Sequence, residues 1–180
     1  MNSPLESDSA NVGPMSTHTD LQGRVALVTG ASRGIGKAVA ADLLARGAAV
    51  TITARKEDQL NAAADELRAA VPGAVVLPIA GNAGDAESRQ STVDRTVAEL
   101  GSLDILINNT GINPVYGSLM DADLDGVKKI FDVNVVATLG YTQRAYHAWM
   151  REHGGAIVTV ASVAGLRSTG VIAAYGASKA

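Results

Sequence analysis

The chain of 180 residues has the length of one ordinary domain and can bury a core. Its net charge of −3 is spread along the chain without a basic block, which argues against nucleic-acid binding, and no apolar run reaches membrane-spanning length. It contains no cysteine and no charged-then-apolar leader pattern, so disulfides and cysteine-ligated metal sites are excluded and a cytoplasmic location is expected.

The first segment, residues 1–20, is polar and rich in Ser, Asn and Asp. It holds too little apolar surface to order itself, so we expect a disordered tail. Met15 lies close to the first apolar run, and translation beginning there is a hypothesis. Residues 21–180 are expected to form a single domain.

The first half of that domain alternates short apolar runs with helical patterns. A strand is expected at 24–29, and apolar residues at helical spacing (Ile35, Ala38, Val39 and Leu43) predict a helix that Gly47 ends. A strand at 49–53 precedes a helix marked by Leu60, Ala63, Ala64, Leu67 and Val71. A third strand at 74–80 precedes a third helix marked by Val93, Val97 and Leu100.

The second half continues the alternation. A fourth strand is expected at 103–108, followed by a longer helical region that Gly154-Gly155 closes. Its apolar positions are Val127, Ile130, Phe131, Val135 and Trp149, and the acidic residues Asp121, Asp123 and Asp125 suit a solvated helix start. A fifth strand is expected at 156–162, and a last helix begins near Ala173.

The expected strands are nearly continuous apolar runs, which is typical of a parallel sheet covered by helices on both faces. Right-handed crossovers then give a doubly wound parallel sheet, the Rossmann type of α/β fold. Ligands of such sheets bind at the carboxyl ends of the strands.

The segment between the first strand and the first helix is glycine-rich. It reads Thr-Gly-Ala-Ser-Arg-Gly-Ile-Gly, and its candidate cofactor-binding residues are Gly30, Ser32, Arg33, Gly34, Ile35 and Gly36. The glycines allow a sharp turn and a close backbone approach, while the following helix directs its N-terminal N–H groups at the ligand. This arrangement suits a pyrophosphate, although glycine turns of purely structural role also occur.

The second strand indicates which dinucleotide is preferred. An NAD site usually has an acidic residue at the end of this strand, but Ala54 stands there and Arg55 follows it. Arg33 and Arg55 could together bind a 2′-phosphate through their forked donors, which favours NADP over NAD. The alternative is two solvated surface arginines.

At this point the sequence resembles the short-chain dehydrogenase/reductase family, in particular its 3-oxoacyl-carrier-protein-reductase-like members. The resemblance runs from about Leu21 to the last residue and rests on several motifs in order. Besides the glycine turn they are Asn108-Asn109-Thr110-Gly111, Asn134, Ser162, and Tyr175 with Lys179. Thr110 departs from the usual Ala, and Asn82 stands where the family often has an Asp that contacts the adenine.

The resemblance implies roles for these residues. The backbone around Asn109 and Gly111 would line the adenosine side of the cofactor, and the Asn82 amide oxygen could still accept from the adenine. Lys179 would hold the nicotinamide-ribose hydroxyls. Ser162, Tyr175 and Lys179 would be catalytic, and Asn134 would join a water-linked proton relay reaching Lys179.

The residue chemistry supports this reading of Tyr175 and Lys179. Spaced i, i+4, they share one helix face, where the ammonium would lower the pKa of the phenol. Such a tyrosine can give a proton to a forming alkoxide, with Ser162 as hydrogen-bond donor to the substrate oxygen. The alternatives are an ordinary exposed helix face for Tyr175 and Lys179, and a satisfied core amide for Asn134.

Family members continue past this last helix, so we expect an N-terminal fragment or truncated frame whose final strands and substrate lid are missing. The sheet would then end at an open fifth strand, and Lys179 would be loosely held. The expected function is NADP-dependent hydride transfer between nicotinamide and a carbonyl or secondary alcohol, with a 3-oxoacyl thioester as first guess. The alternative is an inactive nucleotide-binding fragment or interaction module. The resemblance also implies a homo-oligomer, a dimer or tetramer in the full-length form. From the composition and the residue patterns we expect no metal, nucleic-acid or membrane partner.

Overall fold

The computed structural model describes residues 20–167 and 170–180. The predicted tail and Met15 lie outside the described residues, except for Asp20, the last residue of that segment. Asp20 accepts hydrogen bonds from the Arg46 guanidinium at 3.0 and 2.5 Å. The domain as described therefore begins with an ion pair to the end of its first helix.

The strands form one parallel sheet in the order β3-β2-β1-β4-β5. Their bounds are Val25–Thr29 (β1), Ala49–Ala54 (β2), Val76–Ala80 (β3), Ile105–Asn108 (β4) and Ala156–Thr159 (β5). The order reverses between β1 and β4, so a crevice opens at the carboxyl ends of these two strands. The predicted fold class is confirmed.

Alternating side chains of β1 show why the apolar runs are continuous. Ala26 and Val28 pack in the core on the side of α1 and α2, whereas Leu27 packs on the side of α3 and α5. All three have no exposed surface. Both faces of the central strands are thus removed from water, as the sequence predicts.

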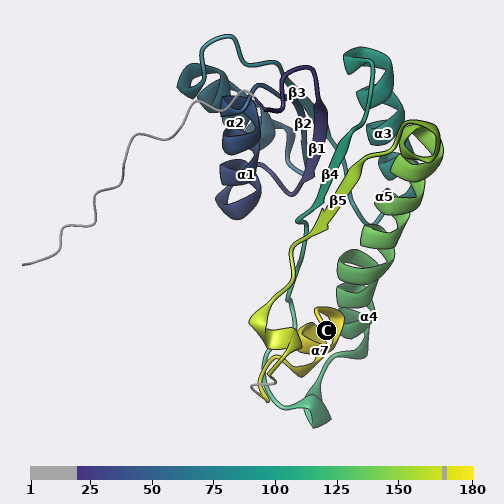
Figure 1. Cartoon of the computed structure of the whole chain (residues 1–180). Helices are drawn as coiled ribbons and strands as arrows, with labels where there is room; N and C mark the ends of the chain where they lie inside the picture. Colours follow the sequence, from purple (N-terminus) through teal and green to yellow (C-terminus); the bar gives the residue numbers. More distant parts are fainter. Residues whose placement is uncertain (1–19, 168–169) are drawn as a thin grey trace, which may run out of the picture.

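Helices cover both faces of the sheet (Figure 1). Helices α1 (Gly34–Ala45) and α2 (Glu57–Ala70) lie on one side, and α3 (Ala86–Leu100) and α5 (Ala137–Ala145) lie on the other. The predicted stripe on α2 is confirmed, because Leu60, Ala63, Ala64 and Leu67 are buried. On α1 the predicted face is partly wrong: Leu43 is buried as predicted, but Ile35 is 64% exposed and Ala38 is exposed. Gly36, Ala40 and Leu44, which were not predicted, are buried.

The long helical region is less regular than a single pattern suggests. After a short 3-10 turn, η1 (Leu119–Asp121), come α4 (Leu124–Phe131), the π-helical η2 (Asp132–Val136), α5, the π-helical η3 (Tyr146–Met150) and α6 (Arg151–His153). The Asp123 carboxylate accepts from the amides of Asp125 and Gly126, so it caps α4 as the acidic start predicts. Phe131 and Val135 do not join the core, being 38% and 42% exposed.

The fifth strand ends earlier than predicted. β5 stops at Thr159, and Ser162 lies beyond it as the N-cap of the 3-10 turn η4 (Val163–Gly165). Among the described residues β5 pairs with β4 alone, and all four of its residues are exposed. The open edge expected from the sequence is present in this structure.

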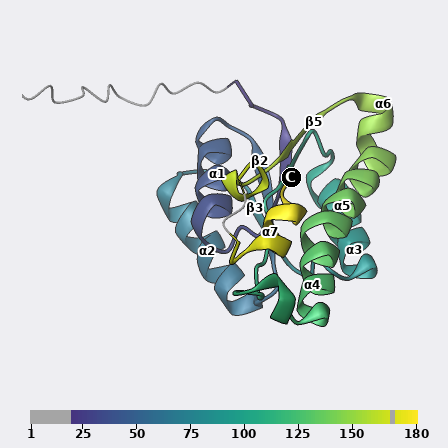
Figure 2. The same cartoon turned by 90° about the horizontal axis from the view of Figure 1, so that it is seen from below.

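The last helix, α7 (Ala173–Ser178), packs against α4 and η4. It lies beyond the carboxyl ends of β4 and β5 (Figure 1), and the view from below shows it between the two helical layers (Figure 2). In residues 20–167 and 170–180, no helix is both long and apolar enough to cross a lipid bilayer.

Candidate functional site

The glycine turn is fixed by β2. The amides of Gly30 and Ala31 donate to the Thr53 carbonyl at 2.8 and 3.2 Å. Gly30 and Gly34 have φ angles of +67° and +56°, a conformation that other residues rarely adopt. The chain can therefore turn sharply from β1 into α1.

Asn109 holds this turn from the end of β4. Its side-chain amide donates to the carbonyls of Thr29 and Gly30 at 2.8 and 3.1 Å. Thr29, which is buried, accepts from the amides of Asn109 and Thr110 through its hydroxyl. A Cβ on Gly36 would lie 2.5 Å from the Asn109 amide nitrogen, so glycine is needed there. The Asn109 side chain thus holds the glycine turn by hydrogen bonds to its backbone. Thr29 also positions this turn, and it was not among the candidate residues predicted from the sequence.

The turn opens into a cavity of about 500 Å³ at the carboxyl edge. Its lining includes Gly30, Ser32, Arg33, Gly34, Ile35, Arg55, Asn82, Asn109 and Gly111, so the structure brings the predicted cofactor residues other than Gly36, Tyr175 and Lys179 into one pocket. Buried Gly36 lies behind the turn, packed against Asn109 and the Gly30 carbonyl.

The charges of this cavity have one sign. Its charged lining residues are Arg33, Arg55, Lys56 and Lys129, and no carboxylate of residues 20–167 or 170–180 lines it. Neither Arg33 nor Arg55 takes part in an ion pair with another described residue, and both are exposed. Helix α1 starts here without a side-chain cap from Arg33 and without an acidic residue in its first turn. The residues present therefore fit a polyanionic nucleotide such as NADP.

The loop after β3 forms one wall of the cavity. The Asn82 side-chain oxygen accepts from the Gly84 amide at 3.1 Å, so one of its two acceptor positions already serves the loop. The Ala83 carbonyl accepts from the Arg89 guanidinium at 2.7 Å. Arg89, which the sequence analysis did not single out, thus braces the wall from α3.

Asn134 lies in the π-helical η2 and is 5% exposed. Its side-chain oxygen accepts from the Ile112 amide at 2.8 Å, and its amide group donates to the Ile112 carbonyl at 3.0 Å and to the Ser178 hydroxyl at 2.8 Å. The buried amide is thus satisfied by the segment after β4 and by α7.

Lys179 is the C-cap residue of α7, so it follows the helix instead of lying within it as predicted. Its ammonium donates to the Val160 carbonyl at 2.9 Å, which contradicts the expectation of a loosely held side chain. A Cβ on Gly111 would lie 3.3 Å from this ammonium, so Lys179 reaches the segment that follows β4. Burial lowers the pKa of Lys179 from 10.5.

Tyr175 and Ser162 come from adjoining segments. Tyr175 lies in α7 and is half-buried, and Ser162 directly precedes η4, which packs against α7. The Ser162 hydroxyl accepts from the Ala164 amide at 3.2 Å and still has a proton to donate. Close packing of α7 on η4 depends on two glycines, since a Cβ on Gly176 would lie 2.7 Å from the Ala164 carbonyl and one on Gly165 would lie 2.2 Å from the Lys179 carbonyl.

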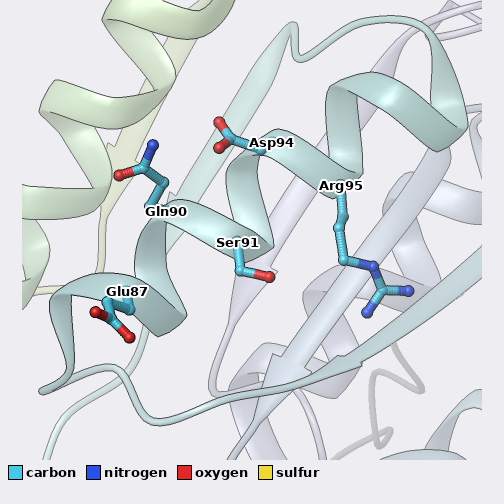
Figure 3. Close-up of a pocket in the computed structure, with 5 residues that line it drawn as sticks. All are labelled: Glu87, Gln90, Ser91, Asp94 and Arg95. Atoms are coloured by element: carbon cyan, nitrogen blue, oxygen red, sulfur yellow. The ribbon is translucent and has the colours of Figure 1, made fainter.

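A second hollow lies on the outer surface of α3 (Figure 3). Its lining residues Glu87, Gln90, Ser91, Asp94 and Arg95 all come from this one helix. None of the predicted site residues contributes to it, so we do not assign it a role.

Comparison with known proteins identifies close relatives. A family model described as short chain dehydrogenase matches residues 24–180. The chain is 37% identical to dehydrogenase/reductase SDR family member 4 of Caenorhabditis elegans over 159 residues, and 37% identical to the 3-oxoacyl-[acyl-carrier-protein] reductase FabG of Escherichia coli over 161 residues. These alignments cover 88% and 89% of this chain but 60% and 64% of the relatives' lengths.

Solved structures give the same result. A short chain dehydrogenase from Burkholderia cenocepacia in complex with NADP superposes with a TM-score of 0.81 at 38% identity, covering 88% of this chain and 64% of the other. An NAD⁺-bound xylitol dehydrogenase superposes with a TM-score of 0.84 at 29% identity, covering 88% and 60%. The chain thus spans about 60% of the length of the proteins that it matches.

Proposed function

Because this chain belongs to the short-chain dehydrogenase family, we propose that it is part of an oxidoreductase that transfers hydride between NADP(H) and a carbonyl or secondary alcohol. The observation that carries the proposal is the cation-lined cavity at the carboxyl edge, with the Lys179 ammonium beside Gly111 of its lining. Tyr175 lies in α7, the helix that Lys179 ends. Residues 21–180 would form the nucleotide-binding domain.

The preference for NADP rests on charge. Arg33 and Arg55 line the cavity and could bind a 2′-phosphate, and Ala54 at the end of β2 offers no carboxylate to a ribose hydroxyl. Their guanidinium groups would bind phosphate oxygens through paired N–H donors. The NADP complex of the Burkholderia relative supports this assignment, while the NAD⁺ of the xylitol dehydrogenase keeps NAD as the competing outcome of the binding test.

The chain's own residues would handle the proton. Bound NADPH supplies the hydride. The Tyr175 phenol would donate its proton to the oxygen that becomes an alcohol, and Ser162 would donate a hydrogen bond to the same oxygen. The charged Lys179 ammonium would favour the phenolate left on Tyr175 and hold the ribose hydroxyls.

Asn134 would contribute to proton transfer from its position between the segment after β4 and α7. Its side chain is occupied by Ile112 and Ser178, so a water-linked relay toward Lys179 would have to use its backbone carbonyl, which already accepts from the Thr138 hydroxyl at 2.9 Å. A carbonyl oxygen has two lone pairs, so a water can share it.

The substrate proposal is a 3-oxoacyl thioester. Its support is the 37% identity to the E. coli 3-oxoacyl-[acyl-carrier-protein] reductase. Steroids, sugars and simple ketones are the alternative substrates, and they are tested beside the thioesters.

We also propose a homo-oligomer formed through the long helical region. Phe131, Val135, Leu139 and Tyr146 expose between 38% and 56% of their surface there, an apolar stripe that a second copy would cover. A cytoplasmic location is also proposed, and cell fractionation would check it.

The function is tested by NADPH oxidation with a panel of 3-oxoacyl thioesters, ketones and sugars. Tyr175→Phe should lower the rate about a hundredfold or more because a positioned proton donor is lost. Tyr116→Phe is the matched control, because Tyr116 is 76% exposed and belongs neither to the cavity lining nor to the proposed interface. NADPH binding without any turnover in the parent chain would favour the alternative of a nucleotide-binding fragment.

A further inference from the structure

Ser178 stands between the proposed catalytic residues of α7 and the rest of the molecule. It is 8% exposed. Its hydroxyl donates to the Tyr175 carbonyl at 2.7 Å and accepts from the Asn134 amide at 2.8 Å. The second contact joins residues 44 positions apart, so it is a tertiary contact and not a feature of the helix alone.

Asn134 carries this connection on to the sheet. Its side-chain oxygen and amide group bind the backbone N–H and carbonyl of Ile112, which follows β4 directly after Gly111. Hydrogen bonds therefore run from Ile112 through Asn134 and Ser178 to Tyr175. They join the cofactor cavity, which Ile112 lines, to the helix that carries the phenol.

We propose that Ser178 is a positioning residue that fixes the end of α7, and with it Tyr175 and Lys179, against Asn134 and the segment after β4. Its effect on catalysis rests on the proposed function, whereas its effect on the structure does not. Among the described residues, Ser178 is the member of the Tyr175–Lys179 motif whose side chain forms a hydrogen bond with the Asn134 side chain.

The energetics require a hydroxyl at this position. The Asn134 amide group has two N–H donors, one on the Ile112 carbonyl and one on Ser178. Removing the hydroxyl would leave one donor buried without a partner and would free the Tyr175 carbonyl, and unpaired buried polar groups are costly. α7 has only six residues and ends in a Lys179 amide bonded to Gly176, so it has little internal stability with which to hold its place.

The competing reading is a local one. A serine hydroxyl commonly bonds the carbonyl three residues earlier in a helix, and such a bond would affect α7 only. The two readings differ at Ile112, whose amide is held by Asn134 and lies outside α7.

Amide hydrogen exchange on the full chain separates them. In Ser178→Ala, and in the nearly isosteric Ser178→Cys, the Ile112 and Gly176 amides should exchange about tenfold faster, the factor expected for loss of one hydrogen bond. Ser178→Thr, which keeps the hydroxyl, should restore slow exchange at Ile112. Ser91→Ala on the exposed face of α3 is the control and should change neither amide.

Unchanged exchange at Ile112 in both Ser178→Ala and Ser178→Cys would overturn the proposal, even with faster exchange in α7. If the β1 amides also exchange faster in Ser178→Ala, that variant is globally destabilised. The exchange rate of the Ile112 amide in Ser178→Cys then decides on the proposal. Where the parent turns over, Ser178→Ala should lower kcat about tenfold and leave the NADPH dissociation constant within about twofold. A parent without turnover would count against the proposed function, and the Ile112 exchange would still decide on Ser178.

Discussion

The Lys179 ammonium donates a 2.9 Å hydrogen bond to the Val160 carbonyl, which lies just beyond the end of β5. This contact brings the last helix to the carboxyl edge of the sheet. It places a lysine between Gly111, the strand end and Asn134, although these groups lie far apart in the sequence.

Replacing Lys179 by Met should change how stability depends on pH. Burial lowers the pKa of Lys179 below 10.5, so the unfolded chain binds more protons than the folded chain between the lowered value and 10.5. The parent's free energy of unfolding should therefore rise relative to Lys179→Met as pH increases through that window. Urea unfolding at a series of alkaline pH values measures this free energy for both proteins. Lys128→Met, which replaces an exposed lysine, is the control. Parallel pH curves for parent and Lys179→Met would contradict the burial of a charged lysine.

Gly165→Ala should disturb the site without touching the cavity. The new Cβ would lie 2.2 Å from the Lys179 carbonyl and 2.8 Å from the Ala180 amide, so η4 or the end of α7 must move. We expect a loss of about 1–3 kcal/mol in stability and a lower kcat, with NADPH affinity retained. Gly84→Ala is the control, because its Cβ would approach only the flexible end of Lys129 within 3.3 Å. Equal thermal stability of both variants would show that α7 does not need this close approach.

Arg33→Ala and Arg55→Ala should each weaken NADPH binding about tenfold or more and leave NADH binding nearly unchanged. Each guanidinium would lose charge-assisted hydrogen bonds that only the 2′-phosphate can accept. Fluorescence titration of both nucleotides measures this, with the exposed Arg144→Ala of α5 as control. If both nucleotides lose affinity equally, these arginines bind the pyrophosphate or stabilise the turn.

Asp104→Asn should destabilise the sheet in a pH-dependent way. Burial raises the pKa of Asp104, but hydrogen bonds from the Val25 amide, Ser102 and Arg24 outweigh it and leave the pKa below 3.8. The stabilisation is thus present above pH 3.8 and is lost as pH falls through the lower folded value. At neutral pH the variant should be less stable by roughly 1 kcal/mol, and the difference should vanish in acid. Asp94→Asn, at an exposed position of α3, is the control. If the stability difference between the parent and Asp104→Asn persists in acid, the charge of Asp104 is not its cause.

The fold was predictable because its signals are local and repeated. Continuous apolar runs such as Ala26–Leu27–Val28 are typical of strands covered on both faces, and the α2 stripe matches its buried residues. The face of α1 was partly missed, because Ile35 lies at the mouth of the cavity, where an apolar side chain remains exposed. Periodicity also could not reveal the π-helical turns at 132–136 and 146–150, which shift the phase of the stripe.

The sequence indicated candidate site residues but not their connections. Charge indicated Arg33 and Arg55, and the resemblance to the family motif indicated Tyr175 and Lys179. Thr29, Arg89 and Ser178 act through contacts that only the tertiary structure creates. The serine directly before Lys179 was visible in the sequence, but no pattern indicated that its partner is Asn134.

The preference for NADP is tested by the pair of dissociation constants of NADPH and NADH for the parent chain. NADPH should bind at least about tenfold more tightly, because only its 2′-phosphate would engage Arg33 and Arg55. Equal affinities, tighter binding of NADH, or no binding of either nucleotide would contradict it.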